Sequence, residues 1–216
     1  MKSFAVIGIG RFGSNLAVTL HSLGYEVLAL DEDEDRISHI AECVTHAVTG
    51  DPKDEAVLRA VGIRNFDCAI VALSEDTQTS ILVTLMLKEM GVPFIVARAI
   101  SELHKRVLQK VGADKVVCPE KEMGTKLAQS LAMTNILDYI DISNDYSIVE
   151  IKTPQKWIGK SIKQLNLRQE YGISVLLVKR QDTEVVDVTP NFDYILNTDD
   201  VMIVAGTHKN FSKLTL

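Results

Sequence analysis

The fold is decided by the stretch Phe4-Ala5-Val6-Ile7-Gly8-Ile9-Gly10-Arg11-Phe12-Gly13. Residues 4–9 form a continuous apolar run, which is typical of a strand buried on both faces of a parallel sheet. The glycines fit the pattern GxGxxG: Gly8 permits a tight turn, Gly10 lets a phosphate approach the backbone, and Gly13 lets the next helix pack closely on the strand. Because a helix begins here, its unpaired N–H groups predict a site for a nucleotide phosphate.

Strand and helix signals alternate regularly over the first 120 residues. Helical spacing of apolar residues marks the segments between the strands. The expected strands are 4–9, 27–31, 46–49, 68–73, 94–98 and 115–118, and the expected helices are 14–23, 33–42, 54–61, 77–90 and 102–111. Strands that are joined in this way by helices predict an α/β fold with a doubly wound parallel sheet.

The pattern changes after residue 119. Residues 120–138 are expected to form one long helix with two apolar stripes, which predicts burial against two bodies. Short alternating strands follow, separated by turn-rich segments, at 146–152, 174–179, 184–188 and 201–205. We therefore predict a Rossmann-like nucleotide-binding domain that includes the long helix, residues 1–140, and a small α+β domain, residues 141–216.

The composition is that of an ordinary globular protein, with 46% hydrophobic and 24% charged residues in a chain of 216. No apolar run approaches the ~20 residues of a membrane-spanning helix, and the early strand pattern leaves no room for a signal peptide. The net charge is −6 and the basic residues are scattered, which argues against a nucleic-acid partner. Of the three cysteines, Cys68 and Cys118 lie in apolar strand-like runs, which predicts buried free thiols in a reducing cytoplasm.

Asp31 ends the second expected strand, 23 residues after Gly8. A carboxylate at this spacing accepts hydrogen bonds from a ribose in dinucleotide-binding folds. The acidic run Asp31-Glu32-Asp33-Glu34-Asp35 would repel an additional 2′-phosphate, so we expect an adenosine nucleotide or NAD(H) rather than NADP(H). The alternative is that Asp31 only caps the following helix.

Further polar residues follow the third and fourth expected strands. Asp51 could accept the amino group of an adenine, or it could only form a turn before Pro52. Ser74 and Asp76 come after the fourth strand, at the same edge of the sheet, where Asp76 could instead cap the next helix.

Three charged residues are expected where the phosphates would lie. Arg11 is inside the glycine loop and Arg98 ends the fifth strand, and a guanidinium grips phosphate oxygens in bidentate fashion. Glu120 begins the long helix at the same edge. It either compensates the helix dipole or ligates a divalent cation on a triphosphate.

Groups that a catalyst would need are missing from the sequence. The part of the chain after residue 140 contains one histidine, His208, and no cysteine, so it offers little for proton transfer to a nicotinamide substrate. No Walker lysine follows the glycine loop. Binding without chemistry is therefore favoured over a small NAD-dependent oxidoreductase. A redox-sensing transcription repressor would need a helix-turn-helix module for which there is no room.

Several stretches resemble the RCK (regulator of potassium conductance) subunits of Ktr/Trk-type potassium uptake systems. The likeness begins with residues 4–13 and covers essentially the whole chain. It continues through Gly62-Ile63-Arg64-Asn65-Phe66, Gly112-Ala113-Asp114-Lys115, Pro119-Glu120-Lys121-Glu122-Met123-Gly124 and Asp145-Tyr146-Ser147-Ile148-Val149-Glu150. The arrangement is most similar to the Ktr branch, whose subunits bind ATP or ADP, whereas the Trk branch favours NAD(H).

The resemblance implies a cytoplasmic octameric ring on the inner face of the membrane, beneath a potassium-translocating subunit, with ATP activating and ADP inactivating. It implies nucleotide contacts from the glycine loop, namely Gly8, Gly10, Arg11, Phe12 and Gly13, with Arg11 on the terminal phosphate and Asp31 on the ribose. Glu120 would join a Mg²⁺ or Ca²⁺ site shared between two subunits, and the long helix would pack on a neighbouring subunit.

A second ligand is also implied for this family. The C-terminal lobe of the Ktr branch can bind cyclic di-AMP at its dimer interface. The positions of this sequence that match that site are Ile162, Arg168, Ile173 and Pro190.

Overall fold

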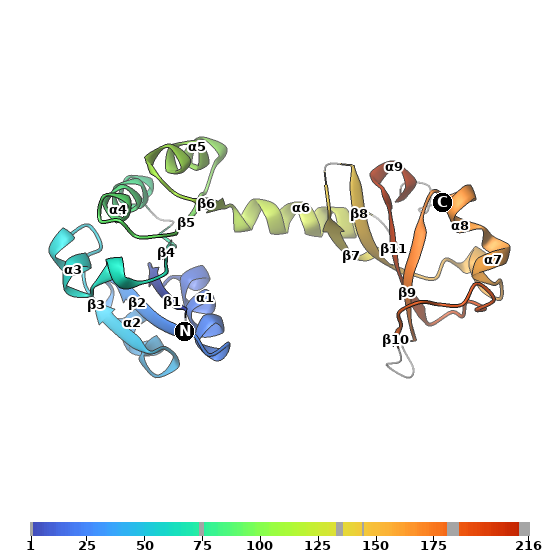
Figure 1. Cartoon of the computed structure of the whole chain (residues 1–216), viewed down its shortest axis with the longest axis horizontal. Coiled ribbons are helices and arrows are strands. Elements are labelled where there is room, and N and C mark those ends of the chain that lie inside the picture. The colour runs from blue at the N-terminus through green and yellow to red at the C-terminus, as the bar shows by residue number, and fades with distance from the viewer. Residues whose placement is uncertain (1, 74–75, 133–135, 144, 181–185, 212–216) are drawn as a thin grey trace. The chain divides into compact units, whose positions relative to one another are not determined.

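The computed structural model describes residues 2–73, 76–132, 136–143, 145–180 and 186–211. The chain divides into two compact units, Met1–Lys121 and Glu122–Leu216 (Figure 1). None of the helices in these ranges is long and apolar enough to cross a membrane.

The first unit is built on a parallel sheet with the strand order β3-β2-β1-β4-β5-β6. Its strands are β1 (Ser3–Ile7), β2 (Glu26–Asp31), β3 (His46–Thr49), β4 (Cys68–Val71), β5 (Ile95–Arg98) and β6 (Lys115–Val117). Its helices are α1 (Arg11–Ser22), α2 (Glu34–Ile40), α3 (Glu55–Ala60), α4 (Thr77–Glu89) and α5 (Glu102–Val111), with short 3₁₀ helices η1 (Ala41–Cys43) and η2 (Ile63–Asn65). The doubly wound sheet that the sequence predicts is confirmed, and its order reverses between β1 and β4.

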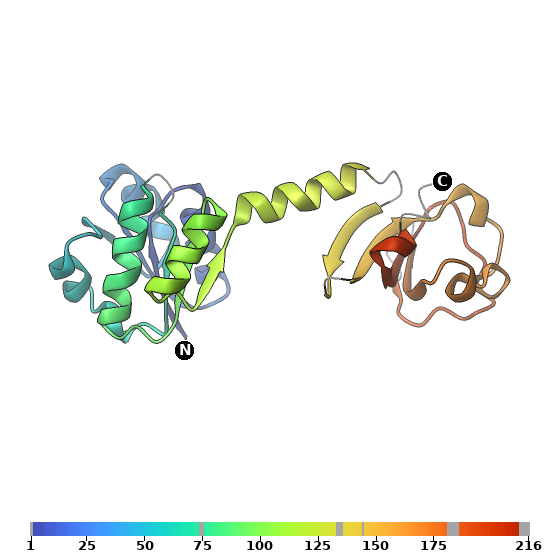
Figure 2. The same ribbon diagram turned by 90° about the horizontal axis from the view of Figure 1, so that it is seen from above.

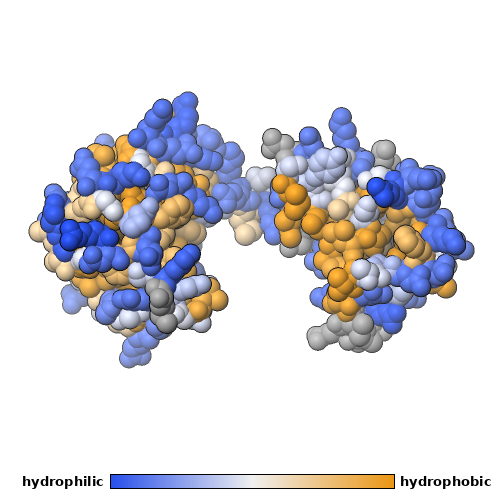
Figure 3. All heavy atoms as spheres, viewed as in Figure 1, coloured by the Kyte–Doolittle hydropathy of each residue, from blue (hydrophilic) through white to orange (hydrophobic). Residues whose placement is uncertain are grey.

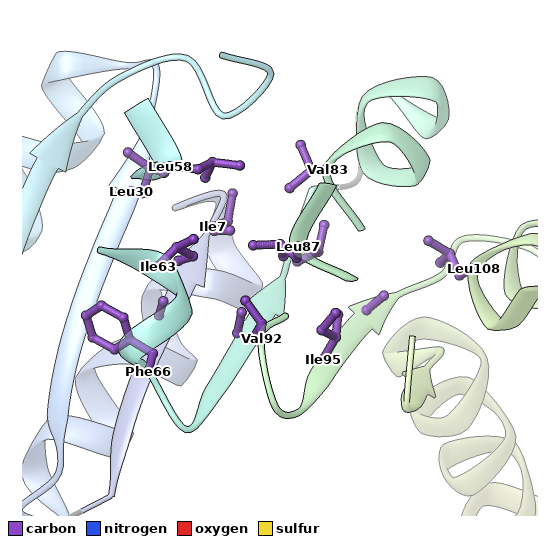
Figure 4. Packing of buried hydrophobic residues seen from close by; sticks show 14 of the residues in the cluster. Ile7, Leu30, Leu58, Ile63, Phe66, Val83, Leu87, Val92, Ile95 and Leu108 are labelled. Atoms are coloured by element: carbon purple, nitrogen blue, oxygen red, sulfur yellow. The ribbon is translucent and has the colours of Figure 1, made fainter. Parts of the chain in front are cut away.

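Successive side chains of the strands point to opposite faces of the sheet, and each face packs in its own hydrophobic core. On one face Ile7 and Leu30 pack with Leu58 and Leu87 of the covering helices (Figure 4). On the other face Val6 and its neighbours pack against α1 and α2. The strands are therefore buried on both sides, which is why their sequences read as continuous apolar runs.

The two cysteines of the apolar runs are buried free thiols, as predicted. Cys68 is 8% exposed and Cys118 is 7% exposed, and both are free thiols. Burial raises the pKa of Cys68 to about 11. Because only the thiolate is a good nucleophile, Cys68 is an inert part of the core at neutral pH.

Side-chain caps start four of the helices in the first unit. Asp33 accepts hydrogen bonds from the backbone N–H groups of Asp35 and Arg36 at the start of α2. Asp54, Asp76 and Ser101 cap α3, α4 and α5 in the same way. Because these caps follow the carboxyl ends of the strands, polar side chains gather at one edge of the sheet.

The second unit, seen from above in Figure 2, is built on an antiparallel sheet. The order of its strands is β10-β9-β11-β8-β7. Its strands are β7 (Ile136–Asp141), β8 (Tyr146–Lys152), β9 (Ser174–Arg180), β10 (Val186–Asp187) and β11 (Asp200–Thr207). Short helices cover one face: η3 (Gln155–Trp157), α7 (Ile162–Leu165), α8 (Leu167–Glu170) and α9 (His208–Phe211). Trp157 is 1% exposed and packs in a core with Ile151, Met202 and Phe211. The predicted small α+β lobe is thereby confirmed.

The long helix is shorter than the sequence predicts. Helix α6 spans Pro119–Ala132, and the expectation of one helix to 138 is wrong. Ile136–Asp141 instead forms β7, which pairs with β8 in the register Ile140↔Ile148. A partner strand that lies later in the chain decides this segment, and its local periodicity does not reveal that partner.

The correction leaves one apolar stripe on α6. Met123, Leu127 and Leu131 lie on it and are 64%, 56% and 77% exposed. The expected second stripe does not exist on a helix, because Ile136 and Leu137 belong to β7, and Met133 lies outside the described residues.

The predicted division of the chain after residue 140 can be tested with two fragments. We expect residues 133–216 to fold alone, as a dimer that buries the surface so small a lobe lacks in its own core. Residues 141–216 should melt at a lower temperature, because removing β7 exposes the backbone groups of β8 at a sheet edge. Circular dichroism melting and sedimentation measure both properties. Equal melting temperatures would show that β7 adds nothing, and an unfolded or monomeric longer fragment would refute the predicted lobe.

Candidate nucleotide-binding site

The glycine loop joins β1 to α1 at the carboxyl edge of the sheet. Gly8 has φ of +95°, a conformation that favours glycine, and its N–H donates to the Leu30 carbonyl at 2.9 Å. A Cβ on Gly13 would lie 1.9 Å from the Gly8 carbonyl oxygen. The chain itself therefore requires these two glycines, one for the turn and one for the close packing of α1.

At position 10, neither the backbone conformation nor a close contact requires a glycine. Its φ is −76°, which any residue adopts, and a Cβ built on it would meet nothing within 4 Å. Gly10 is also the N-cap of α1 and offers no side chain to the first N–H groups of the helix. An open space above unpaired N–H groups is what a phosphate needs.

Two cavities meet at Gly10 and Arg36, which line both of them. The first has a volume of about 220 Å³, and its other lining residues are Gly8, Asp31, Glu32, Pro52, Lys53, Ala72, Leu73, Asp76 and Thr79. The second has a volume of about 670 Å³, and its other lining residues are Ile9, Arg11, Phe12, Ser14, Asp35, His39, Arg98 and Glu120.

Asp31 is the buried polar centre of the first cavity, with 5% of its surface exposed. Its Oδ2 accepts the N–H of Ile9 at 2.5 Å, and its Oδ1 accepts the N–H of Asp33 at 2.9 Å. Arg36 Nη1 lies 3.7 Å from Oδ2. A carboxylate has about four acceptor positions, so ribose hydroxyls can still donate to it. The residue that caps α2 is Asp33, so the capping alternative for Asp31 is wrong.

Asp51 forms the turn that was the alternative to an adenine contact. Its Oδ1 accepts the N–H of Lys53 at 2.9 Å, and its Oδ2 lies 3.6 Å from Lys53 Nζ. The neighbouring Pro52 and Lys53 line the first cavity. An adenine contact by Asp51 itself remains a hypothesis.

The loop after β4 supplies Asp76 to the same cavity. Asp76 caps α4 through Gln78 N–H at 2.8 Å and also accepts the Thr79 hydroxyl at 2.6 Å. The bond from the Thr79 hydroxyl, and then the one from the Gln78 N–H, lower the pKa of Asp76 below its usual value. Ser74, a predicted ligand residue, lies outside the described residues.

Arg98 dominates the second cavity. Its Nη2 donates to the Glu120 carboxylate, and its guanidinium carbon lies 5.4 Å from the centre of the Phe12 ring. The side chain is 13% exposed. Its Nε is buried and finds no hydrogen-bond partner among the residues that the structure describes. The guanidinium is thus held in place but keeps one unused donor.

Glu120 stands in the first turn of α6, with 63% of its side chain exposed. A hydrogen bond from its own backbone N–H, followed by the bond from Arg98, holds the pKa of Glu120 below its usual value. Arg11 lines the same cavity and contributes a smaller effect in the same direction. Glu120 is therefore a carboxylate that faces two guanidinium groups.

A divalent cation at this place would depend on a nucleotide. No group of three or more His, Cys, Asp or Glu side chains able to hold a metal ion occurs in the described ranges. Glu120 supplies one carboxylate, and Mg²⁺ is often bound by one or two carboxylates together with substrate phosphates and water. The residues present fit a cation that arrives with a phosphorylated ligand.

Sequence reasoning missed several lining residues, above all Arg36 and Lys53. Arg36 lies in the first turn of α2, five residues after Asp31, and joins Asp31 and Asp33 by ion pairs of 3.7 and 3.2 Å. Lys53 lies 3.9 Å from Glu32. Their positions just after the ends of β2 and β3 were the available signal, because loops at the carboxyl edge of such a sheet line its ligand crevice.

The residues predicted for a second ligand lie in the second unit. Ile162 and Ile173 are 8% and 1% exposed and pack in its hydrophobic core. Arg168 is exposed and Pro190 is half-buried. A cyclic di-AMP site at these positions remains a prediction.

The sequence is similar to those of known potassium uptake proteins. The TrkA-N domain matches residues 4–119 and the TrkA-C domain matches residues 146–215. The chain is 42% identical over 212 residues to each of two Bacillus subtilis proteins, Ktr system potassium uptake proteins C and A. Each match covers 98% of this chain and 95% of the relative.

Solved structures share the fold of this chain. The GsuK RCK domain superposes with a TM-score of 0.69 over 99% of this chain and 47% of that chain, at 22% identity, which shows a shared fold. GsuK bound to ADP superposes with a TM-score of 0.52 at 29% identity, over 60% of this chain and 33% of that chain.

Two glycine substitutions separate folding from binding. Gly13→Ala should lower the free energy of unfolding by about 1–3 kcal/mol, because its methyl group meets a backbone carbonyl. Gly10→Ala should cost less than about 1 kcal/mol, since its methyl enters open space at a helix N-cap. It should nevertheless weaken adenine-nucleotide binding about tenfold or more, about 1.4 kcal/mol. Urea denaturation and calorimetric titration measure these effects. Unchanged affinity in Gly10→Ala would remove the phosphate from this loop.

Proposed function

This chain belongs to the family of potassium-uptake regulatory proteins that combine a TrkA-N with a TrkA-C domain, and from this premise we propose that it is a nucleotide sensor. In this proposal it carries out no reaction and gates a potassium-translocating membrane subunit. ATP favours ion flux and ADP opposes it.

The observation that carries the proposal is that Gly10 and Arg98 line the same cavity. The open space at Gly10 lies in one cavity with Arg11 and Arg98. These groups attract phosphate oxygens, and none of them is a nucleophile or a general base. The ADP-bound GsuK structure, which aligns with 60% of this chain, supports an adenine nucleotide as the ligand.

Discrimination between ATP and ADP is assigned to the second cavity. A ligand shifts a conformational equilibrium only by its difference in affinity for the two states. Moving a ring from mostly closed to mostly open takes on the order of 5 kcal/mol. In the proposal, this energy comes from the additional phosphate of ATP in each subunit, held by Arg11 and by a Mg²⁺ or Ca²⁺ ion on Glu120 and summed over the ring.

Assembly with copies of the chain and with a membrane partner completes the proposal. The apolar stripe of α6, formed by Met123, Leu127 and Leu131, is exposed in the single chain. Hydrophobic residues also gather on the face of the second unit that Figure 3 shows. Exposed apolar patches of this kind are typical of interaction surfaces, which supports a homo-oligomer, proposed as an octameric ring. The membrane subunit follows from the likeness to Ktr system proteins.

An NAD(H)-sensing subunit of the Trk kind is the alternative, because it would share the same fold and the same Asp31 contact. The likeness of 42% to two Ktr system proteins favours the adenine mononucleotides. For cyclic di-AMP the family resemblance is the sole support, and we keep it as an additional hypothesis for the second unit.

A thermal-shift panel tests the proposed function. It compares ATP, ADP, NAD⁺, NADH and cyclic di-AMP, each with and without Mg²⁺. A ligand that binds only the native state raises the melting temperature by mass action. We expect ATP and ADP to stabilise the protein most. If neither stabilises it, the proposal is wrong, and if NADH alone does, the Trk-type alternative replaces it.

Arg11→Ala should reduce the preference for ATP over ADP. Arg11 lines the second cavity, and its charge is proposed to meet the terminal phosphate. We expect ATP affinity to fall by about 1.5–3 kcal/mol, the scale of a hydrogen bond to a charged group, and ADP affinity to fall much less. Calorimetric titration of both nucleotides measures the difference. An equal loss for both would place Arg11 on the inner phosphates.

Asp31→Asn should weaken every adenosine ligand by about 1–3 kcal/mol, because the ribose contact is common to all of them. Asp33→Asn is the matched control: Asp33 caps α2 without lining the first cavity, and asparagine caps equally well. The same titrations with ATP, ADP and NADH apply. Similar affinities in both variants would limit Asp31 to its contacts with Ile9 and Asp33.

A further inference from the structure

We propose that the Glu120 carboxylate competes with the nucleotide phosphate for the Arg98 guanidinium. In the absence of a divalent cation, Glu120 would thus weaken phosphate binding, and a cation on Glu120 would remove the competitor. This inference rests on the proposed function, because it assigns a regulatory role to one residue of that site.

Arg98 is the fixed member of the pair. It is the last residue of β5, its side chain is 13% exposed, and the Phe12 ring lies 5.4 Å from its guanidinium carbon. Glu120 is 63% exposed on the first turn of α6. The carboxylate can therefore leave the guanidinium for water or for a cation, whereas Arg98 stays at the cavity wall.

Glu120 leaves the hydrogen-bonding capacity of Arg98 partly unused. Nη2 donates to Glu120, but Nε is buried and has no partner in the described part of the chain. A buried donor without a partner is costly, so the pairing of Arg98 with Glu120 is incomplete as it stands. A phosphate has several oxygens and matches the guanidinium fork, whereas Glu120 as placed satisfies one edge of it.

Glu120, a bound phosphate and a divalent cation would influence one another through their charges. Arg98, Arg11 and Glu120 line one cavity with Gly10, where a phosphate would enter. A phosphate that takes Arg98 leaves Glu120 as an uncompensated negative charge beside it. A divalent cation held by Glu120 would remove this repulsion. Such a cation would tighten phosphate binding by two routes, by coordination and by ending the competition for Arg98.

If Glu120 competes with the phosphate, its removal should strengthen nucleotide binding. Glu120→Gln should raise ATP affinity about tenfold when divalent cations are chelated with EDTA, because the neutral amide holds Arg98 far less strongly. The gain should require Arg98. In the Arg98→Gln background, Glu120→Gln should change ATP affinity less than about twofold. If Glu120 acted only by repelling the phosphate, Glu120→Gln would raise ATP affinity at least as much in the Arg98→Gln background as in the wild type.

The matched control is Glu102, whose ion-pair partner Lys121 is the residue next to Glu120 on α6. Glu102 on α5 pairs with Lys121 at 2.5 Å, and neither residue lines the second cavity. Glu102→Gln removes the same charge by the same substitution and also frees a cation on the first turn of α6. It should leave ATP affinity in EDTA unchanged. A tenfold gain in this control would show that net charge, rather than Arg98, governs affinity.

The experiment is a double-mutant cycle by calorimetric titration of ATP into the full chain in EDTA, with ADP as a second probe. Melting curves check that each variant folds. If Arg98→Gln does not fold, Arg98→Lys replaces it, since lysine keeps the charge but lacks the planar fork and Nε. Failure of the wild type to bind either nucleotide overturns the proposed function together with this inference. If the wild type binds nucleotide but the effects of the Glu120 and Arg98 substitutions on affinity are additive, the inference alone is overturned. A loss of affinity in Glu120→Gln has the same consequence.

Discussion

The site depends on one short hydrogen bond between the end of β2 and the glycine loop. The carboxylate of Asp31, at the end of β2, accepts the backbone N–H of Ile9 at 2.5 Å and so holds the glycine loop that follows β1. Its second oxygen fixes the loop before α2 through Asp33. A buried carboxylate is tolerated here because both oxygens are hydrogen-bonded and Arg36 lies close by. The same carboxylate thus holds the loop in its conformation and provides a polar group in the wall of the first cavity.

From this anchor the open space at Gly10 follows. The contact between Gly8 and Gly13 brings α1 onto the sheet with its first N–H groups at the cavity mouth. Nothing in the chain fills the position where a Gly10 side chain would stand. A fold that only needed a tight turn would require the first and third glycines. The middle one has a physical reason only if a ligand approaches the backbone.

Most of the fold could be predicted from sequence because strands buried on both faces leave an unmistakable apolar pattern, as in residues 4–9. The segment 136–141 could not, since its strand conformation comes from pairing with β8, a contact invisible to local periodicity. Residues on the glycine loop and at strand ends were found, because topology alone places them at one edge. Arg36 and Lys53 were missed, because their roles arise from ion pairs between separate loops. The bond between Arg98 and Glu120 likewise joins residues of β5 and α6 that no spacing rule connects.

The two cavities differ in how their charges are balanced, and this difference suggests a division of labour. In the first, Asp31 is tied to backbone donors and Arg36, and Asp76 is tied to its own helix, so no partner needs to change when a ligand enters. In the proposed function, such groups would bind the adenosine part that all the ligands share, and this gives affinity without discrimination. In the second, Arg98 has an unused donor and an exposed partner that can exchange. Only contacts that change with the number of phosphates can shift a conformational equilibrium, so in the proposed function the signal originates there.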